Sequence, residues 1–298
     1  MKQRLEQMCE LVERHCRGPR QETAVSGLTL FRADQPTHPA HLVYNPRILV
    51  ILRGSKTVSL GEAPFEIDAK TFLLVMVDLP VCTRISLPPD GRPHLSLTLD
   101  VDRPLLAEVL EKLPFRPTSS TSSAGVVAAS MSDALLDPFA RLLHLLDAPD
   151  EIEFLRPLIL QEIYFRLFGS GLGDALAQLA MLGSHLCQIG KATSWIKSHY
   201  AEPMSIETLA NIAGMSVTSF HRHFKAVTLM TPLQYRTQIR LQEARRILLS
   251  QRQTAGVAGS SVGYDSQSQF SRDYKRMFGA PPATDVARLV GDLGGLSA

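Results

Sequence analysis

Two stretches of the chain, 50 residues apart, place the same residue types at the same spacing, and this repeat constrains the fold more than any other feature. Each copy begins with a short apolar segment and a glycine suited to a tight turn, Gly214 or Gly263, and continues into a second amphipathic segment. This order predicts two helix-turn-helix units. The corresponding positions are Ser216, Thr218, Phe220, Arg222, Phe224 and Lys225 in the first copy, and Ser266, Ser268, Phe270, Arg272, Tyr274 and Lys275 in the second.

The second helix of each unit is expected to have one apolar and one polar face. Apolar side chains at helical spacing predict buried stripes, formed by Phe220, Phe224 and Val227, and by Phe270, Tyr274 and Met277. The opposite faces suit DNA, because arginine can pair with guanine, glutamine with adenine, and lysine with phosphates. We therefore predict DNA contacts from Ser216, Thr218, His221, Arg222 and Lys225, and from Gln267, Ser268, Ser271, Arg272 and Lys275.

Between the two units, residues 232–250 predict one long helix. A rigid connector of this kind would fix the distance between two reading helices, and successive major-groove faces of DNA lie about 34 Å apart. A single helix-turn-helix pattern is weak, because many helical hairpins mimic it, whereas two copies in register are a stronger signal. The alternative is a structural helical domain with a coincidental repeat. The residues expected inside the connector are Ile239, Leu241, Ala244, Ile247 and Leu248.

The charge of the chain is divided unevenly. Residues 1–184 carry 18 Lys and Arg against 22 Asp and Glu, a net charge of −4, whereas residues 185–298 carry 13 against 7, a net charge of +6. A basic C-terminal part is expected of a region that binds a polyanion, although a solubilising surface bias would give the same asymmetry.

The N-terminal part has short β-rich runs separated by turns rich in Gly and Pro. Seven strands within about 75 residues favour an antiparallel barrel or sandwich over alternating β-α units, and a small barrel can enclose one ligand. We predict an α+β protein with an N-terminal antiparallel barrel or sandwich and an all-α C-terminal domain. The strands are expected at 25–32, 47–53, 56–60, 65–68, 72–77, 81–87 and 94–100.

Amphipathic helices are expected around the barrel, more of them than one side of a small barrel needs. Either one of them pairs with a second copy to form a homodimer, or all of them cap the barrel. The segment 117–130 predicts a loop or the approach to a helix, and the glycines of 169–173 predict a break. The helices are expected at 1–16, 104–113, 132–147 and 150–168, and within 175–197, where a helix ends near His199. The domains are expected at 1–170, 171–190 (linker or start of the helical region) and 191–290.

The residues from Val262 to Pro282 resemble the signature of the AraC/XylS family of bacterial transcriptional regulators almost throughout. The first unit, with Phe220-His221-Arg222-His223-Phe224-Lys225, and Arg240-Leu241 of the connector match too. The resemblance implies seven helices with two helix-turn-helix units, promoter DNA as a partner, and RNA polymerase as a candidate partner. By position it implies base contacts at Thr218, His221, Arg222, Gln267, Ser268, Ser271 and Arg272.

One stretch departs from the family pattern. Residues 255–258 are poor in helix formers, so the second unit is expected to dock less rigidly and to read its half-site more loosely. The N-terminal part resembles a cupin-like domain of the same family at Arg53-Gly54-Ser55-Lys56, Asp78-Leu79-Pro80-Val81 and Pro93-His94-Leu95-Ser96-Leu97. That resemblance implies a region that senses a small-molecule effector and dimerises.

Cationic residues are frequent on or near the predicted strands. Guanidinium groups grip phosphates and carboxylates, so the sharper hypothesis is an anionic effector such as a cyclic dinucleotide. The alternatives are solvated charges that discourage aggregation of sheet edges, and an apolar or sugar ligand inside the barrel. The candidate effector residues are Arg32, Arg47, Arg53, Lys56, Arg84 and Arg92.

An enzyme is the competing class, in the form of a cupin-type barrel with a helical accessory domain. His38 and His41 have no strand-borne partner at ligand spacing, and the sequence has no nucleophile elbow or phosphate-binding glycine loop, so we expect no catalytic residues, metal or cofactor. Four scattered cysteines suggest a reducing compartment, and no apolar run reaches the length of a membrane span, so a cytoplasmic protein is expected.

Overall fold

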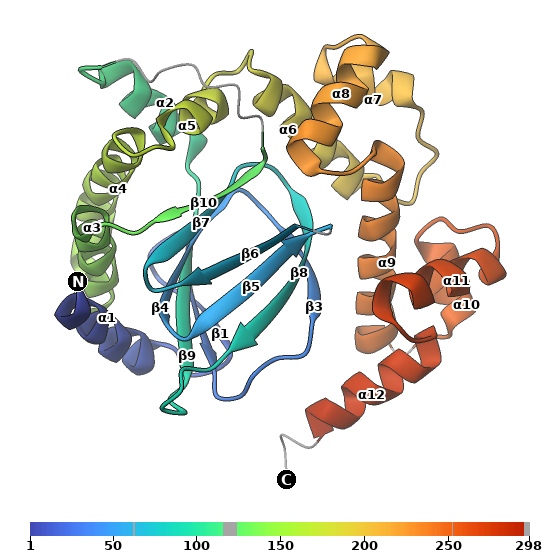
Figure 1. Ribbon diagram of the computed structural model, residues 1–298, viewed down its shortest axis with the longest axis horizontal. Helices are drawn as coiled ribbons and strands as arrows, with labels where there is room; N and C mark the ends of the chain where they lie inside the picture. Colours follow the sequence, from blue (N-terminus) through green and yellow to red (C-terminus); the bar gives the residue numbers. More distant parts are fainter. Residues whose placement is uncertain (62, 116–123, 252, 295–298) are drawn as a thin grey trace.

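The computed structural model describes residues 1–61, 63–115, 124–251 and 253–294. Two antiparallel β-sheets form the centre, with one arc of helices on one side and the C-terminal helices on the other (Figure 1). The predicted α+β class is confirmed. The expected closed barrel is instead two separate sheets. In the described ranges, no helix combines the length and apolar character needed to cross a membrane.

All strand pairs in both sheets are antiparallel. The first sheet has the order β1 (Arg20–Glu22), β2 (Leu28–Ala33), β9 (His94–Asp100), β4 (Arg47–Arg53), β7 (Thr71–Val75) and β10 (Val126–Ser130). The second has the order β3 (Ala40–Tyr44), β8 (Leu79–Ser86), β5 (Ser55–Leu60) and β6 (Ala63–Asp68).

The seven predicted strands are present with small shifts at their ends, and β1, β3 and β10 were not predicted. The prediction of a loop or helix approach over 117–130 is wrong at Val126–Ser130, which pairs along Thr71–Val75 at the sheet edge. Residues 117–123 of that segment lie outside the described residues.

Gly54 explains why two consecutive strands belong to different sheets. The ladder between β4 and β9 shifts register between Ile51 and Arg53, and Gly54 follows with φ +82°. A Cβ at Gly54 would lie 2.7 Å from the Ser86 carbonyl oxygen, so only glycine fits. The chain therefore turns sharply out of the first sheet and enters β5 of the second.

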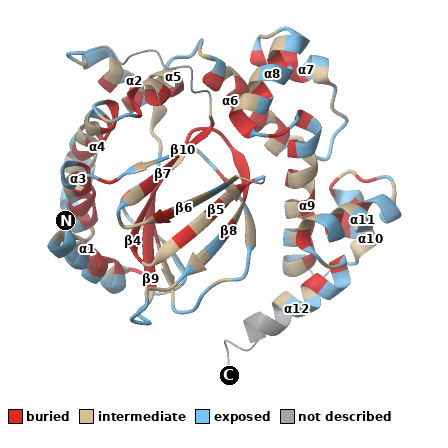
Figure 2. Cartoon of the chain, in the orientation of Figure 1, coloured by how far each residue is buried: buried red, intermediate tan, exposed pale blue. Residues whose placement is uncertain are grey.

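Helices of the N-terminal part cover the first sheet. They are α1 (Lys2–His15), α2 (Arg103–Lys112), α3 (Asp133–His144), α4 (Ile152–Phe168) and α5 (Gly173–Ala180), with short 3₁₀ turns at Leu145–Asp147 and Pro149–Glu151. Helix α1 lies against β4 and β2, and α3 and α4 pack on one another. Their inward faces are buried and their outward faces are mostly exposed (Figure 2).

The C-terminal part has the seven helices that the family resemblance implies, within the described residues. They are α6 (His185–Ser198), α7 (Ile206–Ala213), α8 (Val217–Thr228), α9 (Pro232–Gln251), α10 (Ala255–Ser261), α11 (Gln267–Phe278) and α12 (Pro282–Gly294). The helix expected within 175–197, ending near His199, is α6, which ends at Ser198, whereas α5 before it was not predicted separately. The chain leaves α5 at Met181, and Ser184 caps α6 by accepting a hydrogen bond from the Cys187 amide at 3.0 Å.

The apolar side chains form two separate clusters. The larger one runs from the sheets through α6, α7 and α8 to Ile239 of α9. The smaller one begins at Leu241 and contains the buried residues of α10 and α11. The first helix-turn-helix unit therefore shares its core with the N-terminal part, whereas the second has a core of its own. The domain limits at 170 and 190 stay predictions.

Candidate nucleic-acid interface

Helix α8 presents the polar face that the sequence predicts. Gly214 ends α7 in the left-handed region with φ +66°, and Ser216 caps α8 by accepting from the Ser219 amide. The stripe of Phe220, Phe224 and Val227 is fully buried, as predicted. The residues proposed for DNA contact, Ser216, Thr218, His221, Arg222 and Lys225, are all exposed.

The functional groups on this face are largely free. In the described part of the chain, the side chains of Thr218, His221 and Lys225 form no hydrogen bond or ion pair. Arg222 lies only near His223, with 3.3 Å between its Nη2 and the ring Nε2. Burial, together with the nearby His185 and Arg222, lowers the pKa of His223. Among the described residues these two cations, Arg222 and Lys225, have no carboxylate partner, as a DNA-contacting helix requires.

Helix α11 presents a similar face, with one correction to its buried side. Gln267, Ser268, Arg272 and Lys275 are exposed, and Ser271 is half-buried. Phe270 and Tyr274 are buried as predicted, but Phe278 and not Met277 completes the stripe. Met277 is half-buried and packs against the edge of this core, whereas Phe278, about one helical turn beyond Tyr274, is buried within it. The complete stripe is therefore Phe270, Tyr274 and Phe278.

A buried carboxylate holds α11 against its neighbours. Asp285 of α12 is fully buried and accepts two hydrogen bonds from Arg245 of α9, at 2.8 and 2.9 Å. It also accepts from the Tyr274 hydroxyl at 3.0 Å and from Arg288 at 2.8 Å. The expectation that the second unit docks less rigidly and reads its half-site more loosely stays a prediction. The hydrogen bonds to Asp285 argue against it. Sequence patterns gave no sign of the cluster, because its members lie on three helices.

The connector α9 matches its prediction over Pro232–Gln251, and all five residues expected inside it are buried. Its 20 residues span roughly 30 Å at 1.5 Å per residue. Arg236 and Arg240 both donate to the Tyr200 carbonyl oxygen, at 3.0 and 2.6 Å. These two arginines therefore fix the connector to the first unit.

Residues 24–175, slightly more than half of the chain, match the family model described as the AraC-type transcriptional regulator N-terminus. The chain belongs to the AraC-type family of transcriptional regulators. Residues 209–288 match a second model, described as a helix-turn-helix domain, which covers α8, α9 and α11 of this AraC-type regulator. The family thus agrees with the two exposed faces in assigning DNA binding to the C-terminal part.

Known relatives of this AraC-type regulator are also regulators. The chain is 25% identical over 179 residues to the HTH-type transcriptional activator RhaS of Pectobacterium carotovorum, over 59% of this chain and 62% of that protein. It is 40% identical over 78 residues to the RCS-specific HTH-type transcriptional activator RclR of Escherichia coli, over 26% of this chain and 28% of that protein. The alignments with RhaS proteins span 32% to 62% of their length.

Solved structures of ToxT from Vibrio cholerae share the fold of both parts. An apo variant of ToxT superposes with a TM-score of 0.56 at 10% identity, over 89% of this chain and 98% of that one. ToxT with a bound unsaturated fatty acid superposes with a TM-score of 0.52 at 10% identity, over 87% and 94%. At this identity the likeness establishes the fold alone.

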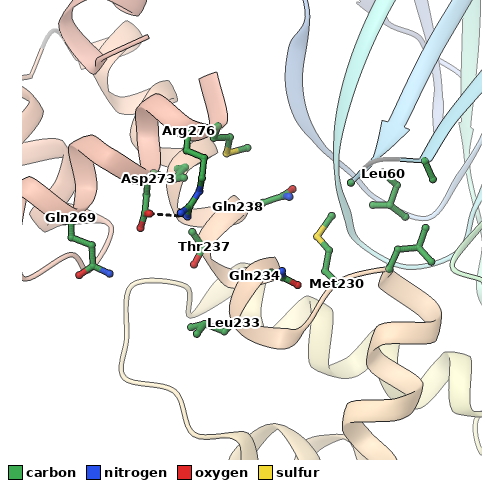
Figure 3. Close-up of a pocket in the computed structure, with 14 residues that line it drawn as sticks. Leu60, Met230, Leu233, Gln234, Thr237, Gln238, Gln269, Asp273 and Arg276 are labelled. Atoms are coloured by element: carbon green, nitrogen blue, oxygen red, sulfur yellow. Dashed lines mark hydrogen bonds and ion pairs between the residues drawn. The ribbon is translucent and has the colours of Figure 1, made fainter. Parts of the chain in front are cut away.

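A groove of about 960 Å³ lies between the β5–β6 turn and α11 of the AraC-type regulator (Figure 3). Leu60 and Gly61 of the β5–β6 turn close one end, α9 forms the floor, and Gln269 and Asp273 of α11 form the other wall. Arg276 also lines the groove, but it is paired with Asp273 at 2.8 Å. No candidate effector residue lines the groove.

The six candidate effector cations do not form one site. Four of them are paired with carboxylates of the chain: Arg32 with Asp34 at 2.7 Å, Arg47 with Asp100 at 3.5 Å, Arg53 with Glu13 at 2.6 Å, and Arg92 with Asp90 at 2.8 Å. Arg53 and Arg92 are neighbours, because both also contact the Glu6 carboxylate, at 3.5 and 2.8 Å. Arg84 is exposed on the outer face of β8. Strand alternation places Lys56 on the opposite, inner face of the same sheet, with Val58 and Leu60.

Lys56 is buried, with 9% of its surface exposed, and it has no ion pair within the described residues. Its ammonium lies 5.6 Å from the Tyr44 ring centroid and 5.9 Å from that of Phe31. The hydroxyl of Tyr44 and the Nδ1 of His94 are buried without a hydrogen-bond partner. Burial and the nearby Lys56 lower the pKa of His94 to about 4, so this imidazole is neutral at pH 7.

Asp78, on the turn between β7 and β8, joins the N-terminal part to the first helix-turn-helix unit. Its carboxylate accepts from Lys197 at 2.7 Å and from Ser194 at 2.7 Å, and its carbonyl oxygen accepts from the Tyr235 hydroxyl at 2.7 Å. The Gly125 amide donates to the Val227 carbonyl oxygen of α8 at 2.9 Å. The family resemblance includes Asp78 but gave it no role. The sequence offers no other signal of these contacts, which join residues 102 to 157 positions apart.

Proposed function

We propose that this AraC-type regulator reads promoter DNA through α8 and α11 together, and that a small molecule bound in the N-terminal part controls the reading. The observation that carries the proposal is the pair of exposed polar helix faces, each anchored by a buried aromatic stripe, on either side of a connector of fixed length. A helix in the major groove needs this division between an anchored face and a free face.

Salt dependence and base substitution test the DNA-binding part. A DNA site is first selected from a random pool with the full chain. Specific binding is expected to weaken steeply with salt, since the cations release counterions from the DNA. Arg222→Ala and Arg272→Ala should each lower the free energy of specific DNA binding by about 1–3 kcal/mol. Lys225→Ala should weaken binding to all DNA sequences alike. If both arginine variants keep the sequence specificity of the wild type, the proposed DNA-contacting faces of α8 and α11 are wrong.

For the effector, we propose an anion with a single carboxylate and an apolar body, held at Lys56. Moving a charge out of water is costly, so a buried ammonium without an anionic partner among the described residues suits an anionic ligand. Tyr44 and His94 offer further polar groups beside it. Structures of ToxT contain an unsaturated fatty acid and a substituted butenoic acid, which are both carboxylic acids. A cyclic dinucleotide needs several free cations, and four of the six candidates are already paired.

Ligand-induced stabilisation tests the effector class. Decanoate is the probe, decanol the uncharged control, and a cyclic dinucleotide the competing ligand. Decanoate should raise Tm in proportion to the logarithm of its excess over Kd. Lys56→Met should abolish the rise, and the exposed Arg84→Ala should leave it unchanged. The Lys56 proposal is wrong if decanol raises Tm as much as decanoate does. It is also wrong if a cyclic dinucleotide raises Tm and Arg84→Ala abolishes that rise.

A barrel enzyme with a helical accessory domain remains the second candidate, because one pair of residues favours it. The Nε2 of His94 lies 3.2 Å from the Oγ of Ser96, in the manner of a base and a nucleophile. Both side chains are fully buried, and Nδ1 of His94 has no carboxylate to orient the ring. We therefore propose a binding module without catalytic activity. Ester hydrolysis that is lost in Ser96→Ala would overturn this. Contact with RNA polymerase and a cytoplasmic location stay predictions.

A further inference from the structure

The reading arginine of α8 is held by an uncharged acceptor. The Nη2 of Arg222 lies 3.3 Å from the Nε2 of His223, and among the described residues no carboxylate pairs with Arg222. A guanidinium group has only N–H donors, so the Nε2 of His223 must be the acceptor in this contact. An imidazole that accepts at Nε2 carries its proton on Nδ1 and is neutral. The contact therefore requires His223 in its neutral form.

The ring of His223 is itself held between two helices. His223 is half-buried beside the apolar stripe of α8, where α6 packs against this helix (Figure 1). Its ring centroid lies 3.8 Å from that of His185, the first residue of α6, with 30° between the two ring planes. The Nδ1 of His185 lies 3.3 Å from the Oε1 of Gln188 on the next turn of α6. Contacts from α6 thus fix the acceptor that Arg222 uses.

The corresponding arginine of α11 has an acceptor of another kind. The Nε of Arg272 donates to the carbonyl oxygen of Ser268 at 3.4 Å, within the same helix. Arg276, on the side of α11 that lines the groove, is instead paired with the carboxylate of Asp273 at 2.8 Å. An uncharged acceptor orders a guanidinium group and leaves its charge free for DNA, which a carboxylate does not. Of the two uncharged acceptors, the imidazole takes up a proton near neutral pH and the backbone carbonyl does not.

We infer that His223 is a positioning residue for Arg222, and that it makes base reading by α8 sensitive to pH while base reading by α11 is not. The inference rests on the proposed reading of DNA by both helices. A proton on Nε2 turns this atom into a donor, so it no longer accepts from Arg222, and two positive charges then face each other across 3.3 Å. The released guanidinium samples many rotamers, whereas a bidentate pair with guanine needs one orientation of its plane.

The direction of the pH effect follows from the surroundings of His223. Burial lowers the pKa of His223 below its usual value of 6.5, and the nearby His185 and Arg222 lower it further. Those two side chains, one on α6 and one on α8, are the titratable groups that act on His223 in the described part of the chain. The neutral, positioning form therefore prevails above pH 6.5, and base preference at α8 is lost as the pH falls below this value.

Base preference measured against pH tests the inference. A DNA site is selected with the full chain, and the bases read by α8 and α11 are identified as those whose preference Arg222→Ala and Arg272→Ala relax. Preference is the Kd for a site with that base substituted, divided by the Kd for the selected site. It is measured at one salt concentration from about pH 8 to about pH 5, on both sides of the usual pKa of histidine. The folded fraction of the protein cancels in this ratio.

The wild type should lose preference at the α8 base by about three- to tenfold towards acid and keep its preference at the α11 base. His223→Gln retains an acceptor near the position of Nε2 but has no group that titrates, so it should keep the preference at every pH. His223→Leu has no acceptor and should show the weakened preference at every pH. His144→Gln, at an exposed histidine of α3, is the matched control and should follow the wild-type profile.

Three results overturn the inference: equal loss of preference at both bases, no loss at the α8 base, or wild-type preference in His223→Leu. Failure of the proposed function gives a different result. In that case Arg222→Ala relaxes no base preference at any pH, and the role of His223 falls with it.

Discussion

Replacing Asp285 by asparagine should release the second reading helix from the connector. The carboxylate is fully buried and receives hydrogen bonds from Arg245, Tyr274 and Arg288, which belong to α9, α11 and α12. Asparagine keeps the shape and one acceptor oxygen but removes the charge. Arg245, whose side chain is only 11% exposed, is then left without its anionic partner.

The size of the effect follows from these exposures. Removing one partner of a buried ion pair costs about 3–5 kcal/mol. The retained amide oxygen places Asp285→Asn at the lower end, about 3 kcal/mol. Arg288 is 55% exposed, so its own pair with Asp285 contributes no more than about 1 kcal/mol, and Arg288→Met serves as the control. The second unit has a separate apolar core, so the loss should be concentrated there.

Hydrogen exchange combined with urea denaturation measures the effect. Amides of α10 and α11 should lose protection in Asp285→Asn, whereas those of α8 and the sheets should keep theirs. In Asp285→Asn, binding to a DNA site should lose its preference for the bases that α11 contacts. The preference for the bases that α8 contacts should be kept. A loss of stability below about 1 kcal/mol, or a loss of protection spread evenly over the chain, would refute the role given to Asp285.

Three further predictions concern the N-terminal part. Asp78→Ala removes two hydrogen bonds to a buried carboxylate and should lower the free energy of unfolding by about 2–3 kcal/mol, more than Ser194→Ala, as read from denaturant midpoints. Gly125→Ala places a Cβ 2.8 Å from the Val227 carbonyl oxygen, so it should lower Tm and expose the loop before β10 to protease. Below about pH 6.5 the unfolded chain protonates His94. The folded chain does so only near pH 4, so stability should fall between these values by up to about 3 kcal/mol, and His94→Gln should flatten this decline.

Local periodicity was sufficient to predict the C-terminal part. The faces of α8 and the limits of α9 follow from residues within one segment, because a helix repeats every 3.6 residues. Met277 was predicted to complete the buried stripe in place of Phe278, because both residues fit an apolar stripe at the end of α11. Which of them is buried depends on α9 and α12, outside the segment. The edge strands β1, β3 and β10 were missed because they are short and carry little alternation.

Contacts between segments that are distant along the chain could not be predicted from the sequence. Lys56 and Arg84 lie on adjacent strands of one sheet but on opposite faces, and only the pairing register separates them. The carboxylates that pair with Arg32, Arg47, Arg53 and Arg92 lie 2 to 86 residues away along the chain. Asp78 meets its partners more than 100 residues away. The number of cations therefore suggested one anion site, whereas among the described residues the fold leaves Lys56 as the one buried candidate without an ion pair.

The most direct test of DNA reading by both α8 and α11 is a comparison of base preferences. DNA sites are selected from a random pool with the wild type, Arg222→Ala and Arg272→Ala, at one salt concentration. The account predicts two blocks of preferred bases about one helical turn apart, with Arg222→Ala relaxing one block and Arg272→Ala relaxing the other. A single block, or two blocks that neither variant changes, would contradict the claim that α8 and α11 both read DNA.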